Sequence, residues 1–213
     1  METATPGPMN GRRAQAARND QVILEAARAV FVADPGAPIS AVAERAGVGI
    51  SALYRRYAGK EDLLRRLCSD GLDRYIAEAE AALTGEDDPW DAFAGFVRRV
   101  VETDNHSLVI NLAGTFAPGE DLHRASAHAN ELTIRIFERA RDAGVLRPGL
   151  AVADVAMVFE QIACLRLGDE ARTAEIRDRY LTLVLDGLRL PSADPLPGPP
   201  PSVEEVNRRW RFE

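Results

Sequence analysis

Apolar residues recur at three- and four-residue spacings over most of the chain, which is the period of an amphipathic helix. The first apolar stripe follows Asn19 and ends at the helix-breaking run Asp34-Pro35-Gly36; its members are Val22, Ile23, Ala26, Ala27, Val30 and Phe31. No segment alternates apolar and polar residues over the length of a strand, so we expect no β-sheet. The pattern therefore predicts an all-α fold.

Two short helices and then a series of longer ones follow this stripe. Gly47 separates the short helices, of which the first covers residues 40–46 and the second runs through Tyr57. Gly59 ends the second one. The longer helices are expected over residues 60–83, from Pro89 past Val100, and over residues 105–116, 118–143, 152–167 and 171–190.

The two ends of the chain differ in composition from the helical part. Residues 1–18 are rich in Gly, Pro, Ala and Arg, and we expect a disordered basic arm there. Residues 191–213 open with six prolines up to Pro201, which is typical of an extended linker. Between these ends the pattern predicts a domain of short helices over residues 19–64 and a helical bundle over residues 65–190.

Residues 38–64 contain the most informative pattern, two short helices joined by a tight turn. Gly47 supplies the left-handed backbone conformation that a residue with a Cβ atom resists. Ser40 is expected to cap the first helix, while Val48 and Leu53 would pack between the two helices. The outer face of the second helix would then be free to enter a major groove of DNA.

These residues resemble the DNA-binding domain of the TetR (tetracycline repressor-like) family. The shared features are the Ala-Gly-Val turn at 46–48, the Leu-Tyr-x-x-aromatic helix at 53–57 and the Lys-Glu-acidic-Leu start of the next helix at 60–63. The resemblance is specific over residues 19–64 and rests on length and helical order beyond them. It implies an N-terminal three-helix helix-turn-helix domain, a C-terminal helical bundle, about nine helices in total, and a homodimer with a ligand cavity in the body.

The resemblance also implies which residues bind DNA. They are Ser40, Ile50, Ser51, Tyr54, Arg55, Tyr57 and Lys60. In the family pattern the two tyrosines and the lysine would anchor phosphates, and the serine would lie near the DNA backbone. The isoleucine, Ser51 and the arginine would face bases.

The chain departs from the family pattern at the start of the second short helix. Gly49 stands where a capping Ser or Thr is usual, and Ile50 stands where a polar residue is commoner. A thymine methyl group is a suitable partner for Ile50. These two positions are the only support for an alternative function, an all-helical small-molecule binding protein without DNA activity.

The charge distribution fits a protein that touches phosphate at one end. Residues 1–60 contain eight basic and five acidic side chains, whereas the remainder contains 18 basic and 28 acidic ones. The net charge of −7 excludes a protein coated in nucleic acid. No apolar run is long enough for a membrane span and no secretory signal opens the chain, so we expect a cytoplasmic protein without a membrane partner.

Arrangements typical of catalysis are missing from the sequence. His106, His123 and His128 do not share a helix face with a set of carboxylates, and Cys68 and Cys164 match no metal or redox spacing. There is no glycine-rich phosphate loop and no nucleophile elbow. We therefore expect no enzyme, no metal and no cofactor.

The middle helices combine large apolar residues with isolated polar ones, as small-molecule sites do. The candidate ligand-binding residues are Phe96, Asn111, Phe116, His128, Glu131 and Phe159. An ordinary core with polar residues at its rim would give the same pattern, and this alternative stays open. An apolar or aromatic effector with a hydrogen-bonding group is the expected ligand.

The last two helices each have one apolar face, which would serve either for packing within one subunit or for a four-helix interface between two subunits, and the family resemblance favours the interface. The two faces comprise Val155, Phe159, Ile162 and Arg166, and Ile176, Tyr180, Leu183, Val184, Gly187 and Leu188. We therefore expect a ligand-responsive regulator, a repressor, that binds double-stranded operator DNA as a homodimer and is released by a small-molecule effector.

Overall fold

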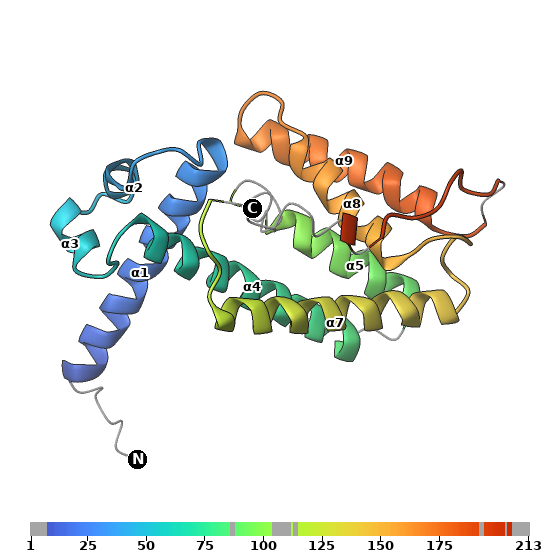
Figure 1. The fold of residues 1–213 in the computed structure, drawn as a ribbon, viewed down its shortest axis with the longest axis horizontal. Helices are drawn as coiled ribbons and strands as arrows, with labels where there is room; N and C mark the ends of the chain where they lie inside the picture. The colour runs from blue at the N-terminus through green and yellow to red at the C-terminus, as the bar shows by residue number, and fades with distance from the viewer. Residues whose placement is uncertain are drawn as a thin grey trace, which may run out of the picture. The chain divides into compact units, whose positions relative to one another are not determined.

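The structure is a computed structural model of the chain. It describes residues 8–85, 88–103, 112, 115–191, 194–202 and 204–205, and side chains from residue 18 onwards. Within these ranges every regular element is a helix, apart from an isolated β-bridge between Leu146 and Arg189 (Figure 1). The prediction of an all-α fold is confirmed.

The eight helices of the described ranges keep the labels of Figure 1. They are α1 (Pro8–Ala33), α2 (Ile39–Arg45), α3 (Ile50–Tyr54), α4 (Lys60–Gly85), α5 (Pro89–Glu102), α7 (Glu120–Asp142), α8 (Val152–Cys164) and α9 (Glu170–Leu188). The further helix expected over residues 105–116 lies almost entirely outside the described residues.

The chain divides into two compact units, Met1–Leu67 and Cys68–Glu213. The boundary falls inside α4, so one continuous helix belongs to both units. No helix in the described part of the chain is both long and apolar enough to cross a membrane.

The first unit contains α1, α2, α3 and the first two turns of α4. Its core is built from apolar side chains with almost no exposed surface, namely Ile23, Ala27, Phe31, Val42, Leu53, Leu63 and Leu67. Helix α1 begins at Pro8, within the segment expected to be a disordered arm. The stretch from Arg12 to Arg18 explains this difference, because Ala, Arg and Gln are strong helix formers.

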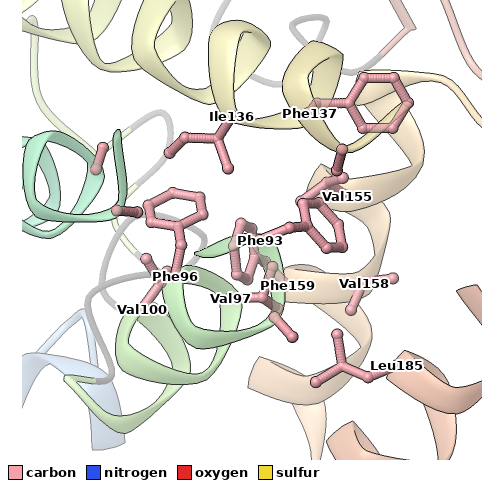
Figure 2. Packing of buried hydrophobic residues seen from close by; sticks show 14 of the residues in the cluster. Phe93, Phe96, Val97, Val100, Ile136, Phe137, Val155, Val158, Phe159 and Leu185 are labelled. Carbon is pink, nitrogen blue, oxygen red and sulfur yellow. The ribbon is translucent and has the colours of Figure 1, made fainter. Parts of the chain in front are cut away.

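In the second unit, α5 lies at the centre and packs against α7, α8 and α9. Two features define where α5 begins. The side chain of Asp88 caps the helix by accepting a hydrogen bond from the Asp91 backbone N–H, and a proline stands in the first turn. Figure 2 shows its aromatic and aliphatic side chains, Phe93, Phe96, Val97 and Val100, pointing toward α7 and α8. These contacts form one continuous apolar core.

Candidate nucleic-acid interface

A tight turn sets α3 against α2 in the first unit. Gly47 has a φ of +66°, and the backbone N–H of Val48 donates to the carbonyl of Ala43 at 3.0 Å. Leu53 has no exposed surface and anchors α3 in the core. This is the geometry that the spacing of glycine and leucine predicts for a helix-turn-helix.

One predicted cap of this motif is wrong. The N-cap of α2 is Pro38, and no side chain caps the helix, because Ser40 already lies in its first turn with an exposed side chain. The Ser40 hydroxyl therefore makes no cap hydrogen bond and is exposed to solvent. It remains available to a partner outside the protein.

The outer face of α3 presents four neighbouring side chains to solvent. Positions i, i+1, i+4 and i+5 lie on one side of a helix, and here they hold Ile50, Ser51, Tyr54 and Arg55, all exposed. Tyr54 keeps 52% of its surface exposed. Among the residues that the structure describes, the side chain of Arg55 has no hydrogen-bond or ion-pair partner. The face thus combines an apolar contact, a hydroxyl, an aromatic ring and a free cation.

Tyr57, expected to bind phosphate, points into the first unit instead. Its surface is 5% exposed, and its hydroxyl donates to Asp20 Oδ1 on α1 at 2.7 Å. Burial, followed by the hydrogen bond to Asp20, raises the pKa of Tyr57 well above its usual value. A phenol has one proton to donate, so in this conformation Tyr57 cannot also donate to a phosphate.

Lys60, which was also expected to bind phosphate, has partners inside the first unit as well. Its ammonium Nζ donates to the carbonyl oxygens of Pro35 and Ala37, each at 2.8 Å, and lies 5.1 Å from the centre of the Phe31 ring. The chain between α1 and α2 is thereby fastened to the start of α4. Lys60 thus links the start of α4 to α1 and to the segment between α1 and α2.

Gly49 begins α3 without a side-chain cap and without a conformational need for glycine. Its φ is −66°, and a Cβ atom there would meet nothing within 4 Å. Gly49→Ser is expected to raise the free energy of unfolding by about 0.5–1 kcal/mol, because serine caps the helix and restricts the unfolded chain. Urea unfolding measures this change. Gly47→Ser, at a positive φ, is the matched control and should lower stability by about 1 kcal/mol; a loss at both positions would contradict the capping argument.

The candidate ligand residues of the second unit do not all come together. Phe96 and Phe159 are buried and meet edge to face, with ring centres 6.4 Å apart, and Phe116 is buried as well. His128 and Glu131 lie on the exposed side of α7, where the imidazole is 3.9 Å from the Glu80 carboxylate. Asn111 lies outside the described residues.

A polar pair that the sequence did not point to lies beside the ring of Phe96. The Tyr75 hydroxyl on α4 is 2.8 Å from Thr133 Oγ1 on α7, and Thr133 in turn donates to the Ala129 carbonyl at 2.8 Å. Since the threonine proton is used, Tyr75 is the donor of the pair. Burial raises the pKa of Tyr75 to about 12. The Tyr75 ring also meets Phe96 edge to face, at 5.4 Å.

Helix α9 has an exposed apolar stripe on the second unit. Tyr180 and Leu183 are 47% and 58% exposed, and Gly187 continues the stripe with open space where a Cβ would stand. The buried Arg177 donates to the carbonyls of Ala163 and Leu165, at 2.8 and 3.1 Å, and so holds the end of α8 against α9. Figure 1 shows these two helices side by side.

Comparison with known proteins agrees with this architecture. The sequence profile of the tetR family of bacterial regulatory proteins matches residues 23–67, and that of the SbtR-like C-terminal domain of transcriptional regulators matches residues 88–190. Together these two matches span well over half of the chain. Among curated proteins, none is similar enough in sequence to count as a match.

Several solved structures are similar over most of the chain. A TetR transcription regulatory protein from Mycobacterium vanbaalenii is 29% identical, with a TM-score of 0.55 over 84% of this chain and 99% of its own. LfrR from Mycobacterium smegmatis, solved in complex with proflavine, is 26% identical, with a TM-score of 0.54 over 78% and 95%. The ketosteroid transcriptional regulator KstR2 of Mycobacterium tuberculosis shares the fold at 20% identity, with a TM-score of 0.58 over 80% and 94%.

Both units thus match the same family, and the helix-turn-helix lies in the unit that the tetR family profile matches. Regulators of this kind are DNA-binding proteins and not enzymes. The chain belongs to the TetR family of DNA-binding transcriptional regulators.

Proposed function

We propose that this protein represses transcription by binding operator DNA as a homodimer, and that a small-molecule effector releases it. The observation that supports DNA binding most directly is the exposed face of α3. Ile50, Ser51 and Arg55 face bases in this proposal, whereas Ser40 and Tyr54 contact the DNA backbone. Tyr57 and Lys60 act from within the first unit, by fixing the helices that present these side chains.

DNA binding itself is tested by enrichment from a pool of random duplexes. The full-length protein should enrich a related set of sequences with two half-sites about one duplex turn, roughly 34–36 Å, apart. Binding should weaken steeply with salt, because phosphate contacts release counterions. If no sequence is enriched, the alternative of a ligand-binding protein without DNA activity is favoured.

Arg55 is expected to determine part of the sequence preference. Arg55→Ala removes an exposed side chain without an internal partner, so the fold should keep its stability. Each lost base contact should cost about 1–3 kcal/mol on the enriched duplex and relax the preference at one position. Competition titrations with single-base variants of that duplex measure this effect. An unchanged preference at every position would remove Arg55 from the base-contacting set.

An effector site in the second unit is the next part of the proposal. The rings of Phe96 and Phe159 and the hydroxyl of Tyr75 offer an apolar environment with one polar group, which suits an aromatic ligand with a hydrogen-bonding atom. The complex of the similar regulator LfrR with proflavine supports this choice. A bound ligand that shifts α4 would change the spacing of the two DNA-binding units.

The coupling between effector and DNA has a reciprocal test. A tenfold loss of DNA affinity needs about 1.4 kcal/mol of coupling, and the same factor must appear in the affinity for the ligand. Proflavine fluorescence titrations with and without the enriched duplex measure one direction, with the duplex alone as the blank because proflavine also intercalates into DNA. Duplex titrations with and without proflavine measure the other direction. Equal proflavine affinity in the two titrations would show that its site is not the sensor.

A further inference from the structure

Helix α3 needs external support to keep its orientation. It has five residues, far fewer than an isolated helix needs to be stable in water. Its N-cap, Gly49, has no side-chain hydrogen bond. Leu53, the fourth of its five residues, is its single buried side chain, and one such contact fixes the orientation of a helix less firmly than several would. What fixes the other end of the helix therefore determines how its outer face is aimed.

Asp20 on α1 provides this second attachment. Its Oδ1 accepts the hydrogen bond from the Tyr57 hydroxyl at 2.7 Å, and the same oxygen lies 3.4 Å from Arg56 Nε. Both partners lie in the turn directly after α3, where Tyr57 N–H donates to the Leu53 carbonyl at 3.0 Å. A hydrogen bond from a neutral hydroxyl to a carboxylate is shorter and stronger than one between neutral groups. One carboxylate thus ties α1 to the end of α3.

We propose that Asp20 is a positioning residue for sequence recognition: through the Tyr57 hydroxyl it holds α3 at the angle at which its outer face meets the bases. This inference rests on the proposed role of α3 in operator binding. Base contacts depend on narrow distances and angles. Contacts to phosphates, by contrast, are largely electrostatic and independent of sequence. A loosened α3 therefore loses recognition of the preferred sequence before it loses its general affinity for DNA.

Three substitutions separate the parts of this contact. Tyr57→Phe removes the hydroxyl but keeps the ring and the Asp20–Arg56 ion pair. Asp20→Ala removes both interactions. Asp20→Asn keeps an oxygen that accepts from Tyr57 but removes the negative charge. Asp73→Asn, at an exposed position of α4 without a partner in the described ranges, is the control for the loss of one charge.

The experiment measures affinity for two duplexes, one enriched from a random pool by the wild-type protein and one with the same bases scrambled. We expect Tyr57→Phe and Asp20→Ala to lose about tenfold on the enriched duplex, the effect of one charged hydrogen bond, and less than about twofold on the scrambled one. Asp20→Asn turns the charged hydrogen bond into a neutral one about half as strong, so it should lose about threefold on the enriched duplex. Asp73→Asn should stay close to the wild type on both duplexes. Circular dichroism at the assay temperature confirms that each variant is folded; if Asp20→Ala is not, the comparison of Tyr57→Phe with Asp20→Asn decides.

Two results would overturn this inference and leave the proposed function intact. Equal losses on both duplexes would mean that the contact only stabilises the fold. A loss in Asp20→Asn as large as in Tyr57→Phe would mean that the charge, and not the hydrogen bond, is what matters. If the wild-type protein enriched no duplex at all, the proposed function would fail first and this inference with it.

Discussion

Lys60→Met is expected to lower the free energy of unfolding by about 1.5–3 kcal/mol, the range for hydrogen bonds to a charged group. The substitution removes the ammonium that joins the carbonyls of Pro35 and Ala37, together with its contact to the Phe31 ring. Methionine keeps the length and the apolar stem of the side chain. The lost stability should therefore reflect the ammonium itself, and urea unfolding measures it.

The salt dependence of DNA binding shows whether the Lys60 ammonium bonds only within the protein or also contacts a phosphate. If Lys60 neutralised a phosphate, its removal would reduce the slope of log affinity against log salt by about 0.9 per DNA-binding unit. We expect the slope to stay at its wild-type value in folded Lys60→Met. Arg55→Met is the matched control, because it removes an exposed cation from the base-facing side of α3 and should relax the sequence preference while leaving the free energy of unfolding unchanged. A reduced slope with wild-type stability in Lys60→Met would reverse the assignment.

Leu183→Glu is expected to turn the proposed dimer into folded monomers. Leu183 is 58% exposed, so the change should alter the stability of a single chain by no more than about 0.5 kcal/mol. In a symmetric interface two carboxylates would be buried against apolar surface, each at a cost of several kcal/mol. The dissociation constant should therefore rise by more than about a hundredfold.

Sedimentation at micromolar concentration, combined with circular dichroism, measures this effect. Leu183 is the better site than its neighbour Val184, because Val184 packs against the core of its own unit. Leu196→Glu makes the same chemical change at an exposed leucine of the proline-rich tail and should leave the dimer intact. A wild-type protein that sediments as a monomer, or a Leu183→Glu variant that stays dimeric, would rule out this face as the interface.

Local spacing in the sequence predicted the helix-turn-helix correctly, and long-range contacts explain what it missed. Gly47 and Leu53 have roles that depend on residues a few positions away, so the pattern contains enough information. Tyr57 finds its partner 37 residues upstream, and Lys60 binds main-chain oxygens, which leave no trace in the sequence. The pattern pointed to Tyr57 and Lys60 but could not show that both bind partners within the first unit.

In the second unit the pattern defined the helices but not their buried sides. A three- and four-residue period shows which residues share a face, yet not which face the rest of the chain covers. On α7 the buried side holds Ala129, Leu132 and Ile136, which leaves His128 and Glu131 in solvent. The Tyr75–Thr133 pair joins two helices 58 residues apart in the chain and could not be found from spacing alone.

The boundary between the two units lies within α4 and not in a linker, and this constrains how such a chain can be recombined. Each residue added to a helix turns everything beyond it by about 100° and shifts it by about 1.5 Å. A chimaera joined between Leu67 and Cys68 therefore preserves the phase of the helix only if no residue is gained or lost at the junction. An insertion of seven residues, about two turns, would nearly restore the angle while moving one unit about 10 Å along the axis. The number of residues in α4 must therefore be kept in any chimaera, just as the identities of its residues must.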